Sequence, residues 1–220
     1  MIMKSARNYI PLVKRREKKG EAWLFGIIAM VFVLILGIYC METIKAFTVD
    51  ENVRDLISAS GLGSLVYDTR EFSITGDLVL NDENGNVDNN FLKLCQLLGY
   101  NLNLQQKNTT EYIGTSPFFN ADGTNCYLKQ AKFYNKRSDG VTVYTYNHAA
   151  DGSYTMTTET IAAGVIVIAP EGSRIDTTSV YISFCYPQDK IQRYSPNDKP
   201  DELQSIITHN VVVGLENYEP

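Results

Sequence analysis

The residues with the greatest chemical potential in this sequence are its four cysteines. Cys40 lies inside a long apolar segment, and Cys95, Cys126 and Cys185 follow that segment. An oxidising environment would permit one disulfide among the last three, with one thiol left over, while three buried free thiols suit the sequence equally well. Spacing does not choose among the three possible pairs. A disulfide therefore stays an open alternative.

The two histidines do not form a recognisable metal or catalytic motif. His148 stands beside an expected turn and His209 in an expected strand, and neither has Cys, His or Glu at the spacing of a zinc site. Nucleophile-elbow, zinc-protease, phosphate-loop and C-x-x-C motifs are missing from the sequence as well. We therefore expect a non-enzymatic protein with no catalytic, metal-binding or cofactor-binding residues.

Aromatic side chains offer a third kind of chemistry, the stacking of a ligand on rings. The sequence has 14 Tyr and 9 Phe. Strands favour aromatic residues in any case, which predicts a packed core, and the alternative is an exposed face that binds a peptide, a glycan or a cell-wall component. The rings in question are Phe133, Tyr134, Tyr144, Tyr146, Tyr154, Tyr181, Phe184 and Tyr186.

The first structural element that the sequence predicts is a helix in a long apolar segment. Trp23 to Met41 is nineteen residues long and carries no charge. As a helix it spans roughly 28 Å, close to the thickness of a bilayer's hydrocarbon core. We expect a transmembrane helix over residues 22–41, with the lipid bilayer as its partner and Gly26 and Gly37 as the small residues available for helix packing.

Charge sets the expected orientation of this helix and excludes one class of partner. Residues 1–21 hold seven Lys and Arg against two Glu, a charge of +5 in a chain whose formal charge is -5, so the remainder carries -10. Cations before an apolar segment favour a cytoplasmic leader over residues 1–21 and an extracellular remainder in a single-pass cell-membrane protein. An acidic body repels phosphate backbones, so we expect no nucleic-acid partner.

The helix is expected to continue past the membrane as an amphipathic segment over residues 42–69. Val49, Val53, Leu56, Ile57 and Ser60 share one side of a helical wheel, and no proline interrupts the segment. Small residues close it, among them Ser60 and Gly63. These small residues permit close approach by a neighbouring helix or sheet, or they indicate that the end of the helix frays. The helix is expected to end between residues 61 and 69.

Residues 70–220 are expected to form a β-rich extracytoplasmic domain. A β-like run over residues 72–80 and a turn-rich loop precede a short helix over residues 91–98. Alternating residues and turn signals then predict hairpin-linked strands over residues 127–137, 141–147, 154–169, 179–186 and 206–217. The expected fold class is α+β, with a transmembrane helix that continues as an amphipathic helix packed on a C-terminal antiparallel sheet.

This order of elements resembles the pilin plan. A basic leader reaches Gly20, an apolar helix follows, and a segment rich in small residues, VRDLISASGLG at 53–63, leads to Tyr67 and Asp68. Over residues 14–80 the chain is similar to TadE/TadG-like proteins of the tight-adherence (Flp) pilus machinery. The resemblance implies a pilin-like fold and possible processing at Gly20, although Glu21 stands first after that glycine and Phe25 stands where such proteins carry Glu.

Together, the residues and the resemblance predict a membrane-anchored component of a surface pilus or related secretion apparatus. Its expected partners are other pilus or secretion subunits, and its role is assembly or structure. The alternative is an anchored extracellular binding module for a peptide, glycan or cell-wall component.

Overall fold

The computed structural model describes residues 13–81, 86–114, 126–189 and 204–215. The chain divides into two units, Met1–Ala46 and Phe47–Pro220. The first unit holds most of helix α1, which runs from Val13 to Ser64 without a break. The expected continuation of the helix beyond residue 41 is therefore confirmed, and its last residue lies within the predicted range. The fold is α+β, with a long apolar helix followed by an antiparallel sheet.

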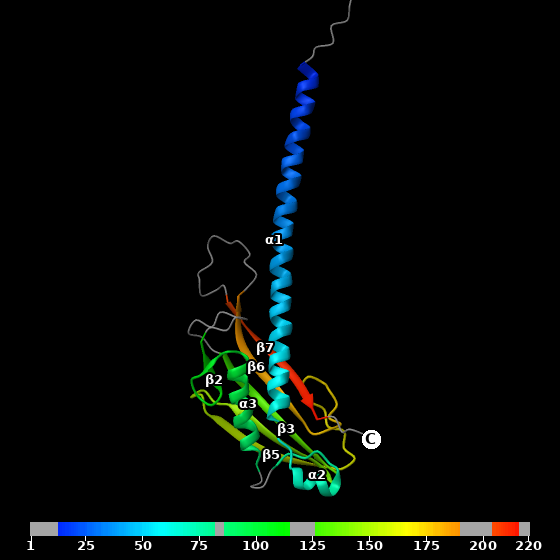
Figure 1. Cartoon of the computed structure of the whole chain (residues 1–220), viewed down its shortest axis with the longest axis vertical. Coiled ribbons are helices and arrows are strands. Elements are labelled where there is room, and N and C mark those ends of the chain that lie inside the picture. Colours follow the sequence, from blue (N-terminus) through cyan, green and yellow to red (C-terminus); the bar gives the residue numbers. More distant parts are fainter. Residues whose placement is uncertain (1–12, 82–85, 115–125, 190–203, 216–220) are drawn as a thin grey trace, which may run out of the picture. The chain divides into compact units, whose positions relative to one another are not determined.

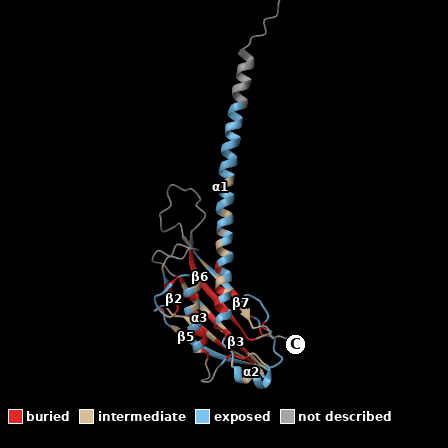
Figure 2. Ribbon diagram, in the orientation of Figure 1, coloured by how far each residue is buried: buried red, intermediate tan, exposed pale blue. Residues whose placement is uncertain are grey.

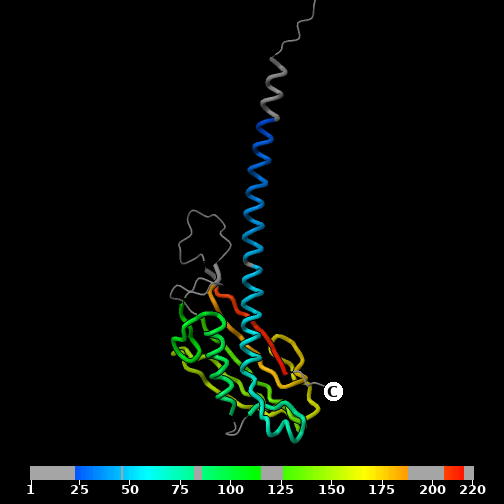
Figure 3. Tube along the Cα trace, viewed as in Figure 1, coloured from blue at the N-terminus to red at the C-terminus, as the bar shows by residue number. Residues whose placement is uncertain are grey.

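The second unit is built on a seven-stranded antiparallel sheet. Its central strands lie in the order β5-β4-β3-β6-β7, and β2 joins the first residues of β3 with β1 beyond it. Strands β3 and β6 pair although they lie far apart in the sequence, as Figure 3 shows by their colours. The strands are β1 Gln105–Gln106, β2 Glu111–Ile113, β3 Cys126–Arg137, β4 Gly140–His148, β5 Tyr154–Ala162, β6 Ser179–Asp189 and β7 Gln204–Gly214.

One face of this sheet is covered by the last part of α1 and by α3, Asp88–Asn101 (Figure 1). Along α1, Val53 and Ile57 are buried while Glu51 and Arg54 are exposed, which confirms the amphipathic pattern. The pleat places every second side chain on this face. The large core so formed includes Phe91, Leu94 and Leu98 from α3, Phe133 from β3, Tyr144 and Tyr146 from β4, and Ile182, Phe184 and Tyr186 from β6.

The opposite face carries a smaller core beneath the connection between β5 and β6. Val167, Ala169 and Ile175 of this connection pack with Tyr134, Val141, Val143 and Tyr181 of the strands. Burial raises the pKa of Tyr134 to about 12, helped by the charge of Glu171. Figure 2 shows the strands as the buried centre of the unit. Both faces of the sheet are therefore covered around its middle strands.

The β-like run expected over residues 72–80 is wrong, because its first four residues belong to helix α2, Thr69–Thr75, and Leu80 makes only an isolated bridge with Tyr67. Asp68 caps this helix by accepting hydrogen bonds from the backbone N–H groups of Arg70, at 2.8 Å, and Glu71, at 3.2 Å. Gly76 ends it with a φ of 78°, a left-handed conformation that suits glycine. The alternation of apolar residues suggested a strand, but the capping interactions at both ends favour a helix.

The other strand predictions hold with changed ends. The strand expected over residues 154–169 ends at Ala162, and the strand expected to reach residue 217 ends at Gly214. The helix expected over residues 91–98 is confirmed as α3, three residues longer at each end. The sequence analysis missed β1 and β2, which are too short to show a periodic pattern.

Candidate functional site

The apolar part of α1 is the most unusual surface of the described residues. From Trp23 to Met41 its large side chains are exposed, and none of its most apolar window is buried (Figure 2). Removing apolar surface from water is worth roughly 25 cal/mol per Å², so a helix of this kind is unstable in water without a cover. It is also the one described helix long and apolar enough to cross a membrane. By its length and composition, this helix therefore fits a single-pass membrane protein.

The glycines expected to support packing in the membrane have free space around them. A Cβ atom added to Gly26 or Gly37 would meet nothing within 4 Å. Both positions can accept a neighbouring helix without moving any part of the described chain. Gly20 and Glu21 lie in the helical backbone of α1, and side chains at residues 13–22 lie outside the described ones, so processing there stays an expectation.

The small residues at the end of α1 allow close approach to the chain's own sheet and to α3. Ser60 is fully buried and accepts a hydrogen bond from the Asn101 side-chain amide at 2.9 Å. A Cβ on Gly63 would lie 2.8 Å from Cδ1 of Leu97. At Ser60 and Gly63, α1 thus lies close to α3 and its backbone stays helical. Gly61, which the sequence analysis did not select, is the most crowded of the group.

Cys95, Cys126 and Cys185 are all buried and all free, so the structure contains no disulfide among them. Burial raises the pKa of the Cys95 and Cys126 thiols to about 12. The thiolate is the reactive form of cysteine, and its suppression makes these side chains inert packing groups. Cys40 is exposed on the apolar part of α1.

His209 joins the sheet to α1 in a three-residue cluster. Its Nε2 lies 2.9 Å from Oδ1 of Asp50 and 2.9 Å from the hydroxyl of Tyr186, and the two rings stack with their planes 9° apart. A proton on Nε2 satisfies the Asp50 carboxylate. Burial and the nearby Asp50 carboxylate raise the pKa of Tyr186. The cluster fixes the helix on β6 and β7, a structural role that no local sequence signal reveals.

His148 belongs to a second polar cluster, at the junction of β2 and β4. The Thr110 hydroxyl donates to the carbonyl of Gly152 at 3.0 Å and lies 2.8 Å from Nδ1 of His148, which makes Nδ1 the donor between them. Nε2 of His148 lies 4.0 Å from the Glu111 carboxylate, which also binds Lys107 at 3.2 Å. These contacts hold the edge of the sheet together.

The part of the chain that the structure describes contains no cluster of side chains suited to bind a metal ion. Within it no three His, Cys, Asp or Glu side chains gather closely enough to hold an ion. The loop expected before α3 falls partly on residues 82–85, which lie outside the described residues.

The aromatic residues form the core and not a binding face. Seven of the eight rings selected from the sequence are buried, and Tyr154 is half-buried against Phe91 at a centroid distance of 4.7 Å. Phe91 also stacks on Tyr146 at 4.1 Å with the planes 6° apart. The idea of an exposed aromatic sheet surface is therefore wrong, because both faces of the sheet are covered around β3, β4 and β6, where the seven buried rings lie.

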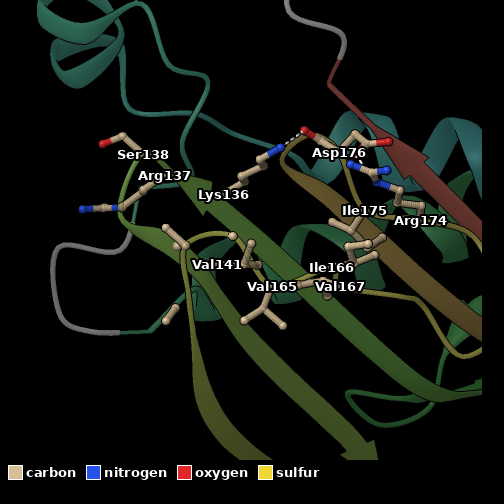
Figure 4. Close-up of a pocket in the computed structure, with 14 residues that line it drawn as sticks. Lys136, Arg137, Ser138, Val141, Val165, Ile166, Val167, Arg174, Ile175 and Asp176 are labelled. Carbon is tan, nitrogen blue, oxygen red and sulfur yellow. Dashed lines mark hydrogen bonds and ion pairs between the residues drawn. The ribbon is translucent and has the colours of Figure 1, made fainter.

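A cavity of about 220 Å³ opens at the end of the β3–β4 hairpin. Figure 4 shows Val141, Val165, Val167 and Ile175 along it, with Lys136, Arg174 and Asp176 beside them. The Lys136 ammonium donates to the backbone carbonyl of Asp176, and Arg174 pairs with the Asp176 carboxylate at 2.8 Å. The sequence analysis missed this site because its lining comes from three separate segments.

The cavity is lined by apolar side chains beside three cationic ones. Lys136 and Arg174 both contact Asp176, and Arg137 pairs with Glu71 at 3.4 Å. Val165 and Ile166 are exposed at its edge. Pockets for drug-sized ligands are commonly 300 to 1,000 Å³, so this hollow is small for a free metabolite and better sized for part of a peptide.

Family models, curated proteins and solved structures were each compared with the chain, and none of them matches it. The class that the fold itself defines is an α+β protein with, among the described residues, one helix able to span a membrane.

Proposed function

We propose that this protein is a non-enzymatic, single-pass membrane component of a surface pilus or related secretion apparatus, with a minor pilin-like role in assembly or structure. The observation that carries the proposal is helix α1. It combines an exposed apolar length with a final segment that packs on an antiparallel sheet. That order is the one shared with pilins and with TadE/TadG-like proteins.

The mechanism we propose is mechanical. The apolar helix holds the chain in the bilayer, with its basic leader in the cytoplasm and the β-rich unit outside the cell. Lateral contact with other subunits occurs by van der Waals packing between helices, where small residues such as Gly26 and Gly37 let backbones approach. The second unit then offers a rigid surface, because both faces of its sheet are packed around the middle strands.

Affinity capture of the full chain after crosslinking in its native cells tests this proposal. We expect pilin subunits or proteins of the secretion platform among the crosslinked partners, and fewer or altered surface fibres in a strain that lacks the gene. Complementation should restore the fibres. Intact fibres in the deletion strain, together with no pilus or secretion protein in the crosslinks, would contradict the proposal.

A second candidate function, an anchored binding module for a peptide, is favoured only by the cavity beside Val165 and Ile166. Under that function, replacing both residues with Ser abolishes ligand capture and leaves the fibres unchanged. Under the pilus function, the strain that lacks the gene has altered fibres. Complementation restores those fibres with the wild-type chain and equally with the chain in which both residues are Ser. The same strains therefore distinguish the two functions.

A further inference from the structure

Strand β5 forms an open edge of the sheet. It pairs with β4 along its whole length, from His148↔Tyr154 to Gly140↔Ala162, with no bulge. Within the described residues no strand pairs with its other side. Residues 155–160 are exposed. Such an edge directs alternate backbone N–H and C=O groups outward, where they can pair with a further strand.

The sequence of β5 lacks the features that usually protect an edge. Its residues, YTMTTETIA, include no Lys, no Arg and no Pro, and Glu159 is the only charged residue. Proteins discourage edge pairing with lysines, prolines, bulges or short strands. This strand is nine residues long and rich in threonine, a residue that favours strands. The edge is therefore suited to pairing.

We propose that β5 pairs antiparallel with β5 of a second copy of this chain, with Thr158 opposite Thr158. In this register Tyr154 lies opposite Ala162, so a large side chain meets a small one, and Met156 lies opposite Thr160. Glu159 lies opposite Thr157, so no like charges face each other directly. A Thr–Thr pair across two strands stabilises a sheet, and no pair in this register places like charges directly opposite, so the strand is complementary to itself.

The pairing makes one continuous sheet with a twofold axis at Thr158, perpendicular to the sheet. Along α1, Asp50 contacts His209 and Gly61 approaches Val213, so this part of the helix runs in the same direction as β7. Four antiparallel pairings separate β7 from β5, so the helix also runs in the direction of β5. The two helix segments are therefore antiparallel in the pair. For the anchored chain of the proposed function, this suits copies presented from facing surfaces.

Disulfide crosslinking of the full chain in detergent tests the register, because detergent leaves both relative orientations accessible. The background variant is Cys40→Ser, since the other three cysteines are buried. Oxidation of Thr158→Cys should give a covalent dimer with at least tenfold higher yield than oxidation of Thr155→Cys. Both positions are exposed on the same strand, but residue 155 lies far from its own copy in this register. A mixture of Met156→Cys and Thr160→Cys chains should also crosslink.

Sedimentation of the same detergent-solubilised chain tests the association itself. Thr158→Lys places two ammonium groups opposite each other and should raise the dimer dissociation constant at least tenfold, with an unchanged circular dichroism spectrum. Asn52→Lys, an exposed position on α1, is the matched control and should leave the dimer intact. A wild-type chain that stays monomeric overturns the proposal. So does a dimer that persists in Thr158→Lys, or equal crosslinking at residues 155 and 158.

Discussion

Burial decides the chemistry of the cysteine side chains more than their position in the sequence does. Cys95 sits in the main core, where the hydroxyl of Tyr112 donates to its backbone carbonyl at 2.9 Å. A charged thiolate at this place would be poorly solvated, which is why the pKa of the thiol rises to about 12 from 9.0. The same holds for Cys126. The sequence shows thiols, and only the fold shows that they are unreactive.

The free energy of unfolding should therefore fall as the pH rises from 9 towards 12. The unfolded chain loses its thiol protons near pH 9.0, while folded Cys95 and Cys126 keep theirs to about 12. Their contribution to stability is full below pH 9 and is lost above it. Urea unfolding of the full chain in detergent between pH 7 and 10.5 measures this slope.

A Cys95→Ala/Cys126→Ala variant is the control for this slope, and its stability should change less over the same pH range. Native alkylation at pH 8 gives a second reading. We expect neither thiol to react until the chain unfolds, and reaction at the rate of the unfolded chain would show that they are not buried.

At the scale of elements, the close packing of α1 against the sheet depends on one glycine, Gly61. A Cβ on Gly61 would lie 2.5 Å from Cγ2 of Val213, 2.8 Å from Cδ1 of Ile182 and 3.3 Å from Cγ1 of Val180. Valine side chains have little freedom to move aside. The helix can approach the sheet this closely only because residue 61 has no side chain.

Gly61→Ala should destabilise the β-rich unit by about 1 to 3 kcal/mol, because the extra methyl group overpacks the contact with the sheet. Gly63→Ala is the matched control, since its added atom meets only the end of the flexible Leu97 side chain. It should be neutral, or stabilising by up to about 1 kcal/mol through helix propensity. Chemical unfolding of the full chain in detergent measures both. Equal stabilities would mean that α1 is not held against β6 and β7 at this point.

At the scale of the whole molecule, the apolar length of α1 should decide where the protein resides. Leu34 lies in the middle of the exposed apolar segment. Leu34→Arg should lower the share of the protein in the membrane fraction, because an arginine at a helix centre costs about 2.5 to 3.5 kcal/mol on insertion. Asn52→Arg, on the same helix beyond the segment, should have no such effect. Carbonate extraction and sedimentation of cell membranes measure this. A wild-type chain that stays in solution without detergent is the contrary result.

The elements that the sequence predicted well are those with long patterns. Strands β3, β4 and β6 are long runs rich in residues that favour strands, and α3 repeats apolar residues at helical spacing. The errors fall where a pattern is short or where capping decides the outcome. Helix α2 is set by Asp68 and Gly76, and β1 and β2 exist through pairing with distant β3.

The polar cluster at His209 and the cavity near Val165 are formed by residues that lie far apart in the sequence. Tyr186 and Asp50 meet although they are 136 positions apart, and the cavity near Val165 combines three segments. The sequence by itself determined the apolar helix, its amphipathic continuation and the β-rich remainder, since each depends on local periodicity. Only the tertiary structure decided which thiols are inert, which glycine seats the helix and which strand edge stays open, because these depend on neighbours that the order of residues does not reveal.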